Sequence, residues 1–200
     1  HIFKLVLAVF IGFIVFRFSL EIWKSIDIGL ILFSFFLLTL VFIPFIGHEA
    51  NGASRWIRLF GFSFQPSELM KFSLIVYISS YCYRRMTEFK EKWIGFWKPV
   101  LVVVLAIALV LLEPDLGSSA VIFLISLTIM FIAGAPLKQM SIILFMGSMV
   151  FVSMIILVPW RMQRILSFVD PWSAYGESGY QLSQALIAFS RGDLFGVGLG

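Results

Sequence analysis

The stretch WIGFWKPVLVVVLAIALVLL-EPD-LGSSAVIFLISLTIMFIAG, residues 93–134, decides the fold class of this chain. It holds two apolar runs, Trp93–Leu112 and Leu116–Gly134, separated only by a Glu-Pro-Asp tripeptide. A helix needs about 20 mostly apolar residues to cross the hydrocarbon core of a bilayer. Proline and two acidic residues between the runs predict a tight turn at a membrane surface. We therefore expect two transmembrane helices here and not one long helix.

The composition of the whole chain agrees with a membrane protein. Hydrophobic residues make up 60%, charged residues make up 13%, and the mean hydropathy is +1.02. A soluble domain carries about 25% charged residues. The net charge is +4, but the basic residues lie between apolar runs, so they indicate topology and not nucleic-acid binding. The single cysteine, Cys82, excludes an internal disulfide and a cysteine metal site.

Six apolar runs are candidates for membrane spans. They are His1–Phe16, Ile26–Ile46, Ser67–Tyr83, Trp93–Leu112, Leu116–Gly134 and Met140–Pro159. We therefore expect residues 1–159 to form an all-α transmembrane helix bundle, and residues 160–200 to begin a large extracytoplasmic loop. This tail is polar over 170–178, helix-like over 180–189 and then rich in glycine. Because the chain begins with histidine and stops within the glycine-rich run, we expect it to be a fragment.

The basic residues predict the orientation of the chain in the membrane. Loops 17–25, 84–98 and 135–139 carry most of them, whereas the opposite short loops carry only Arg55 and Arg58. Cytoplasmic loops are enriched in lysine and arginine. We therefore expect loop 47–66, turn 113–115 and the tail after Pro159 to face outside. The unusual polar residues of the chain then concentrate on one side of the membrane.

The segment Gln65-Pro-Ser-Glu-Leu-Met-Lys71 is the first candidate for function. Pro66 and Ser67 are typical of a helix start, and Glu68 and Lys71 share a helix face at a spacing of three residues. Charges at the end of a membrane span are expected to pair. Two interpretations stay open: an ion pair that only fixes the helix, and a pair that lines a polar, substrate-facing cavity.

Two outer segments offer a cation and a carboxylate. Arg55 stands beside Trp56 in Asn-Gly-Ala-Ser-Arg-Trp, where arginine could hold lipid phosphate oxygens and tryptophan would sit at the headgroup level. An ordinary interfacial anchor is the alternative. Asp115 precedes a helix, so it is either an N-cap or a carboxylate facing the same outer pocket as Arg55.

The tail adds Arg161 and Arg164, and then spaced glycines from Gly192 to Gly200. The glycine run is not a nucleotide loop, because no Lys-Ser/Thr follows it and no strand precedes it. The two histidines, His1 and His48, make a histidine metal site improbable, and no Ser-His-Asp set stands out.

These motifs, in this order, resemble the SEDS family (shape, elongation, division and sporulation) of peptidoglycan polymerases, over nearly the whole chain. The segment Ala188-Phe-Ser-Arg-Gly-Asp193 resembles the cell-division branch more than the elongation branch. The segments that carry the resemblance are 51–57, 64–71, 113–117, 164–172 and 178–200.

The resemblance implies a fold of ten transmembrane helices, of which the six runs would be the second to the seventh. It implies polymerisation of lipid II on the outer face of the bacterial inner membrane at the division septum, with release of undecaprenyl diphosphate. It also implies two kinds of partner, a class B penicillin-binding transpeptidase and other divisome proteins. We expect the substrate to be bound by Arg55, Gln65, Glu68, Lys71, Asp115 and Arg164.

The family's proposed catalytic aspartate lies in a His-Thr-Asp segment after the glycine-rich run, beyond Gly200. None of Asp27, Asp115, Asp170 and Asp193 matches it, so we expect no catalytic residue here and no activity from the fragment alone. A carboxylate would deprotonate the attacking sugar hydroxyl. Arginine, lysine or a divalent cation, Mg²⁺ or Mn²⁺, would offset the charge of the leaving diphosphate.

Two other functions use the same features. A lipid II flippase also needs a polar cavity open to lipid, but that cavity must be reachable from both sides, and the polar residues here are one-sided. A non-catalytic scaffold for division proteins needs docking surface, which the short cytoplasmic loops restrict. We therefore favour the glycosyltransferase.

Overall fold

The computed structural model describes residues 2–43, 47–50, 53–59, 62–172, 179–192 and 196. The chain divides into two compact units, His1–Leu144 and Phe145–Gly200. The first unit contains α1 (Ile2–Arg17), α2 (Leu20–Leu40), β1 (Gly47–Ala50), β2 (Ala53–Leu59), β3 (Phe62–Phe64), α3 (Pro66–Arg84), α4 (Met86–Glu91), α5 (Trp93–Leu112), α6 (Leu116–Ile132) and the start of α7 (Leu137–Ile156). The second contains the rest of α7, α8 (Pro159–Val169) and α9 (Tyr180–Gly192).

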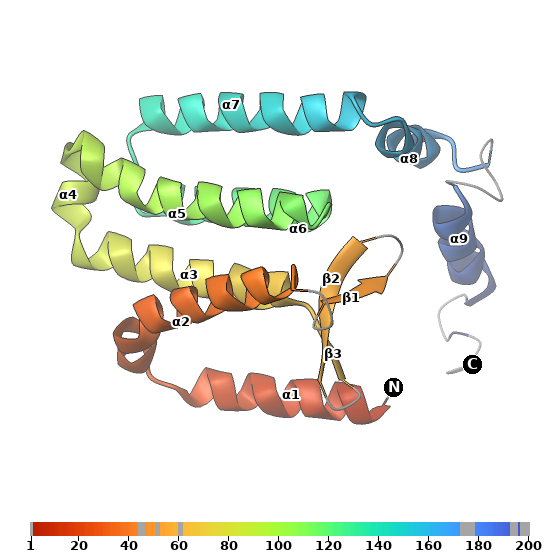
Figure 1. Ribbon diagram of the computed structural model, residues 1–200, viewed down its shortest axis with the longest axis horizontal. Helices are drawn as coiled ribbons and strands as arrows, with labels where there is room; N and C mark the ends of the chain where they lie inside the picture. Colours follow the sequence, from red (N-terminus) through yellow and green to blue (C-terminus); the bar gives the residue numbers. More distant parts are fainter. Residues whose placement is uncertain are drawn as a thin grey trace. The chain divides into compact units, whose positions relative to one another are not determined.

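The helical fold expected from the apolar runs is confirmed. Helices α1, α2, α3, α5, α6 and α7 correspond to the six runs (Figure 1). Of the described helices, α2, α5 and α7 are long and apolar enough to cross a membrane by themselves, while α6 and Leu5–Arg17 of α1 are shorter apolar helices. The chain is therefore a multi-pass membrane protein, and the Glu-Pro-Asp turn separates α5 from α6 as predicted.

The boundaries of two predicted runs are wrong. Run Ile26–Ile46 is helix α2, which begins at Leu20 and ends at Leu40, and Ile46 itself lies outside the described residues. Glu21 suits the positive N-terminal end of a helix, so charged residues extend α2 beyond its apolar stretch. Run Met140–Pro159 is α7, which ends at Ile156, because Pro159 begins α8.

Segment 47–66, which was expected to be a loop facing outside, contains a small sheet. The order is β1-β2-β3, and both pairs are antiparallel, with Ile57 opposite Gly47 on one side and Phe64 on the other. Ile57 is buried at 3% exposure, while Arg58 is exposed. This alternation is the period of a strand, and it fixes Arg55 and Ile57 on the same face of β2.

The predicted loop 84–98 also contains structure, the short helix α4. Phe89 of α4 is fully buried, and its ring lies 5.8 Å from that of Phe96 on α5. Gly95 makes this packing tight, because a Cβ placed there would lie 2.1 Å from the Glu88 carbonyl oxygen. The hydroxyl of Tyr81 on α3 donates to the Gly95 carbonyl at 2.8 Å, which ties three helices together.

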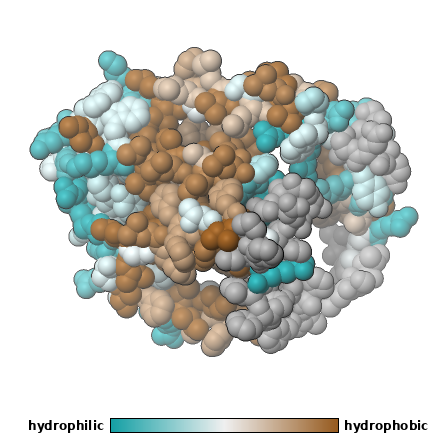
Figure 2. Space-filling model, viewed as in Figure 1, coloured by the Kyte–Doolittle hydropathy of each residue, from teal (hydrophilic) through white to brown (hydrophobic). Residues whose placement is uncertain are grey.

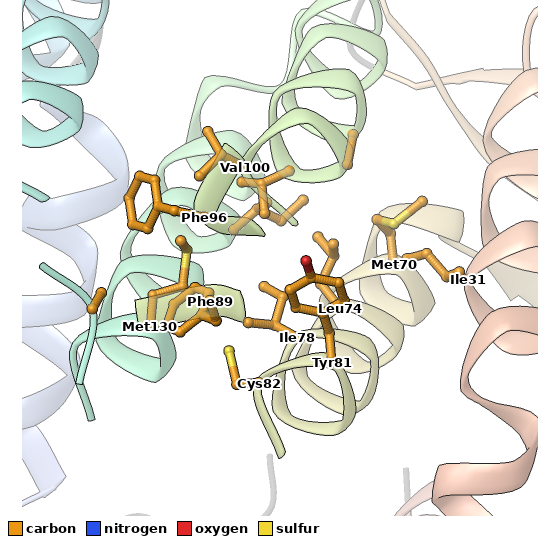
Figure 3. Packing of buried hydrophobic residues seen from close by; sticks show 14 of the residues in the cluster. Ile31, Met70, Leu74, Ile78, Tyr81, Cys82, Phe89, Phe96, Val100 and Met130 are labelled. Carbon is orange, nitrogen blue, oxygen red and sulfur yellow. The ribbon is translucent and has the colours of Figure 1, made fainter. Parts of the chain in front are cut away.

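The core of the first unit is built around α3. Met70, Leu74 and Ile78 recur every four residues along one side of α3 and are each at most 1% exposed (Figure 3). Small polar residues let α2 approach on another side, where the hydroxyls of Ser34 and Ser73 are 2.6 Å apart. Such hydrogen bonds between helices help association where the surrounding lipid is as apolar as the side chains.

The outer surface of the helices is apolar, as lipid requires. Figure 2 shows hydrophobic side chains over much of the helix flanks, and hydrophilic side chains gathered at the left edge, where Figure 1 places α4. Helix α7 has no buried residue along its length. Within the first unit, α4 and the three-stranded sheet lie at opposite ends of the helices (Figure 1).

Candidate functional site at the sheet and the α5–α6 turn

Arg55 is held by backbone carbonyls of the α5–α6 turn. Its Nε donates to the backbone carbonyl oxygen of Glu113 at 2.9 Å, and its Nη2 donates to the backbone carbonyl oxygen of Pro114 at 2.6 Å. These acceptors are neutral, and among the described side chains no carboxylate forms an ion pair with Arg55. A guanidinium has five N–H donors in a planar fork. Arg55 is therefore oriented by hydrogen bonds to neutral groups, without an ion pair among the described side chains.

Asp115 organises the start of α6. Its Oδ1 accepts from the backbone N–H of Ser118 at 3.0 Å, and its Oδ2 accepts from the Ser118 hydroxyl at 2.8 Å. The N-cap interpretation is thus confirmed. The same Oδ2 accepts from Nε2 of Gln65 at 2.9 Å, which joins the start of α3 to the turn. Asp115 consequently orients Gln65, while the backbone carbonyls of the turn orient Arg55.

Glu113 is the residue of this turn that sequence reasoning left without a role. Its side chain is 1% exposed, and neither carboxylate oxygen has a hydrogen-bond partner among the described residues. Burial, followed by the negative charge of Asp115, raises the pKa of Glu113 to about 8, although Arg55 acts in the opposite direction. The side chain is therefore neutral at pH 7. The signal in the sequence was a glutamate between an apolar run and a proline.

Glu68 and Lys71 form the expected pair on the first turns of α3. Lys71 Nζ lies 2.7 Å from Glu68 Oε1, so the predicted pairing is confirmed. The lysine side chain is 19% exposed, while the glutamate side chain is 58% exposed. Both residues lie at the same end of α3 as Gln65, but no described contact connects them to Arg55 or Asp115.

Arg164 belongs to the second unit and is described there alone. Its Nη2 donates to Gln181 Oε1 of α9 at 3.2 Å, between two exposed side chains. Of the six predicted residues, the structure thus joins Arg55, Gln65 and Asp115 through one turn, pairs Glu68 with Lys71, and places Arg164 in a separate network. Of the sequence motifs, residues 51–52, 178, 193–195 and 197–200 lie outside the described residues.

The opposite end of the first unit holds a second set of charges. Asp27 on α2 is 1% exposed and accepts from Nη2 of Arg84 at 2.6 Å. Glu88 bridges Lys98 and Arg85, each at 2.7 Å. The hydrogen bond from Lys98, then that from Arg85, lowers the pKa of Glu88 to about 2. These ion pairs connect α2 to α3, and α4 both to its junction with α3 and to α5, at this end of the first unit.

A divalent cation finds no ready site in the part of the chain that is described. There, no group of three or more His, Cys, Asp or Glu side chains comes together. Asp115 already accepts three hydrogen bonds, and Glu113 stands alone as a buried, neutral carboxyl.

Comparisons with known proteins agree with this architecture. The family model for the cell cycle proteins FtsW, RodA and SpoVE matches residues 1–200. The chain is 43% identical over 189 residues to the probable peptidoglycan glycosyltransferase FtsW of Saccharophagus degradans, covering 94% of this chain and 49% of that protein. It is 42% identical to the protein of that name from Coxiella burnetii, covering 100% of this chain and 54% of the relative.

Among solved structures, a chain of a peptidoglycan synthase complex that coordinates polymerisation and crosslinking has the same fold. It matches with a TM-score of 0.70 and 28% identity, covering 95% of this chain and 56% of that one. The chain therefore spans about half the length of the relatives it matches.

Proposed function

This chain belongs to the cell cycle protein family of FtsW, RodA and SpoVE, and we propose that in the full-length protein it forms the substrate-side part of a peptidoglycan glycosyltransferase. The names of the relatives support this activity, because several are called probable peptidoglycan glycosyltransferase FtsW. The division member of the family also suggests the place of action, the bacterial inner membrane at the septum.

The proposed reaction joins glycan units carried on a lipid diphosphate. A sugar hydroxyl attacks the anomeric carbon of lipid II, a new glycosidic C–O bond forms, and the bond to the diphosphate oxygen breaks. The hydroxyl proton passes to a carboxylate, for which we propose the family's aspartate beyond Gly200. The leaving undecaprenyl diphosphate gains negative charge, and fixed cations lower the barrier by stabilising that charge.

The observation that carries the proposal is the anchoring of Arg55. Two neutral carbonyls at 2.9 and 2.6 Å hold its guanidinium at the end of the bundle predicted to face outside. A pre-oriented guanidinium suits the paired oxygens of a phosphate group. Because its orientation needs no carboxylate, its charge is not neutralised before substrate arrives.

The remaining residues support this cation in two ways. Gln65 and Asp115 hold the start of α3 against the turn that carries the Arg55 acceptors. Lys71, paired with Glu68, is proposed as a second cation along α3, and Arg164 as one supplied by the tail.

A penicillin-binding transpeptidase is the proposed partner, which is supported by the fold shared with a chain of a peptidoglycan synthase complex.

The test is polymerisation of lipid II by the full-length protein with its transpeptidase, read as glycan chains on a gel. Replacing Arg55 by alanine removes a charge that acts mainly in the transition state. We expect the rate to fall by roughly 100- to 1,000-fold, with membrane insertion unchanged. Arg55→Lys should recover only part of this loss, because lysine cannot reproduce the two-pronged contact with the turn.

Arg58 supplies the matched control, since it is an exposed arginine on the same strand with no described contact to the turn. Arg58→Ala should keep a rate close to that of the unmodified protein. Normal polymer from Arg55→Ala would remove Arg55 from the site. Lipid II delivered across vesicles without polymer would favour a flippase, and division supported by a catalytically dead protein would favour a scaffold.

A further inference from the structure

Helix α8 has two chemically different sides. Met162, Ile165, Leu166 and Val169 follow the i, i+3, i+4, i+7 spacing that places residues on one face of a helix. Ile165, Leu166 and Val169 are 45%, 60% and 84% exposed, so this apolar face is uncovered. The other side carries Gln163, Arg164 and Ser167.

Contacts of α8 with its own unit involve its polar side, while on the apolar face only Met162 is half-buried and Ile165, Leu166 and Val169 stay exposed. Ser167 is only 5% exposed, and Arg164 donates to Gln181 of α9. A helix of a soluble domain turns its apolar stripe toward the protein and its polar side toward water. The opposite arrangement of α8 is the one expected where the surrounding medium is apolar.

The connection from α7 indicates which apolar medium this is. Helix α7 is apolar enough to cross a membrane and ends at Ile156, and α8 begins at Pro159. Arg161 links the start of α8 to the end of α7. Its Nη1 donates to the backbone oxygen of Met154 at 3.1 Å, and its guanidinium lies 5.2 Å from the centre of the Trp160 ring. Tryptophan and arginine are typical of the headgroup level of a bilayer, so α8 starts where a membrane span ends.

The charge of α8 fits the same surface. Its sequence PWRMQRILSFV contains two arginines and no acidic residue. Low overall hydrophobicity, a marked apolar face and basic residues together characterise helices that lie in a membrane interface. Phospholipid headgroups supply the phosphate oxygens that arginine binds.

We propose that α8 is an interfacial helix, which lies in the leaflet where α7 ends and inserts Ile165, Leu166 and Val169 at the headgroup–acyl boundary. Helices of this kind bury their apolar face about 5–10 Å into the bilayer. The bilayer would thereby hold the beginning of the tail after α7 at a fixed level, with Arg161 at the level of the phosphates. This inference does not depend on the glycosyltransferase activity.

Two labelled positions test the proposal in the full-length protein, made free of other cysteines and placed in phosphatidylethanolamine–phosphatidylglycerol vesicles. Ile165→Cys and Gln163→Cys are two residues apart and therefore on almost opposite sides of α8. An environment-sensitive fluorophore at 165 should show blue-shifted emission, quenching by lipids brominated high on the acyl chain, and severalfold less quenching by aqueous iodide than the label at 163.

Other outcomes would overturn the proposal. Equal iodide quenching at the two positions would place the apolar face in water. A label at 165 shielded from both iodide and brominated lipid would show that protein covers this face. A label that loses its iodide quenching only when the transpeptidase is added would identify that partner, and not lipid, as the occupant.

Discussion

At the scale of single residues, the outer turn combines one oriented cation with one buried neutral acid. Arg55 obtains its orientation from peptide carbonyls, each a charge-assisted hydrogen bond worth about 1.5–3 kcal/mol in favourable cases. Glu113, whose backbone carbonyl is one of these acceptors, has a buried carboxyl group without a hydrogen-bond partner among the described residues. The backbone of one residue thus serves the site, while its carboxyl makes the local fold sensitive to pH.

The raised pKa of Glu113 predicts a pH-dependent stability. Its value is about 8 in the folded chain, against an ordinary 4.5, so unfolding releases a proton between these limits. The stability associated with Glu113 should be fully present below about pH 4.5 and should be lost as pH rises through 8. Glu113→Gln, neutral at every pH, should flatten that decline, which thermal unfolding of the full-length protein in detergent at several pH values will measure.

The exposed Glu68 provides the control for this titration. Glu68→Gln should leave the shape of the melting temperature against pH between 5 and 9 as it is in the unmodified protein, because Glu68 is largely in solvent. Parallel curves for the unmodified protein and Glu113→Gln would show that Glu113 is already ionised in the folded state at neutral pH and contradict this prediction.

At the scale of elements, the tightest constraint is the packing of α4 on α5. Gly95→Ala places a methyl group 2.1 Å from the Glu88 carbonyl oxygen, so α4 must shift away from Phe96. Overpacking of this kind costs about 1–3 kcal/mol. We expect a melting temperature several degrees lower for Gly95→Ala, measured by thermal unfolding in detergent.

Gly29 of α2 provides the matched control for Gly95, because among the described residues nothing packs within 4 Å of a Cβ placed at Gly29. Gly29→Ala should be neutral or stabilising by roughly 0.5–1 kcal/mol, the ordinary gain of alanine over glycine inside a helix. Similar losses for both variants would mean that the effect comes from helix propensity or insertion, and that α4 is not packed as described.

Some of the helices and strands could be predicted from the sequence alone, and others could not. Helices α5 and α6 were predicted almost to the residue, because lipid demands long apolar runs and a Pro-Asp turn separates them. Helix α4 was missed because its six residues are held by Phe89 against Phe96, a tertiary contact. The sheet was missed because β2 is stabilised by pairing with β1 and β3, which are too short to be recognised alone.

The contacts of the candidate site likewise divide into local ones, which the sequence predicted, and long-range ones, which it could not predict. The Asp115 cap and the Glu68–Lys71 pair are local, so spacing along the chain predicted them. The acceptors of Arg55 could not be predicted, since they are backbone carbonyls 58 and 59 residues later in the sequence, and every residue has a carbonyl. Only the folded arrangement of β2 and the turn identifies them.

At the scale of the whole molecule, the placement of charge predicts the orientation in the membrane. Ser63 of β3 and Thr87 of α4 are both exposed and belong to opposite ends of the first unit. In spheroplasts, a membrane-impermeant maleimide should label Ser63→Cys directly and Thr87→Cys only after permeabilisation. The reverse pattern would place the sheet in the cytoplasm, where the proposed reaction does not occur.

The long sequence separation between Arg55 and its acceptors sets an order of events during biogenesis. Translation proceeds at about 5–20 residues per second, so Glu113 and Pro114 leave the ribosome roughly 3–12 s after Arg55. The strand that carries Arg55 therefore leaves the ribosome before its acceptors do. The contacts that orient the guanidinium can form only after α5 and the turn that follows it have been synthesised.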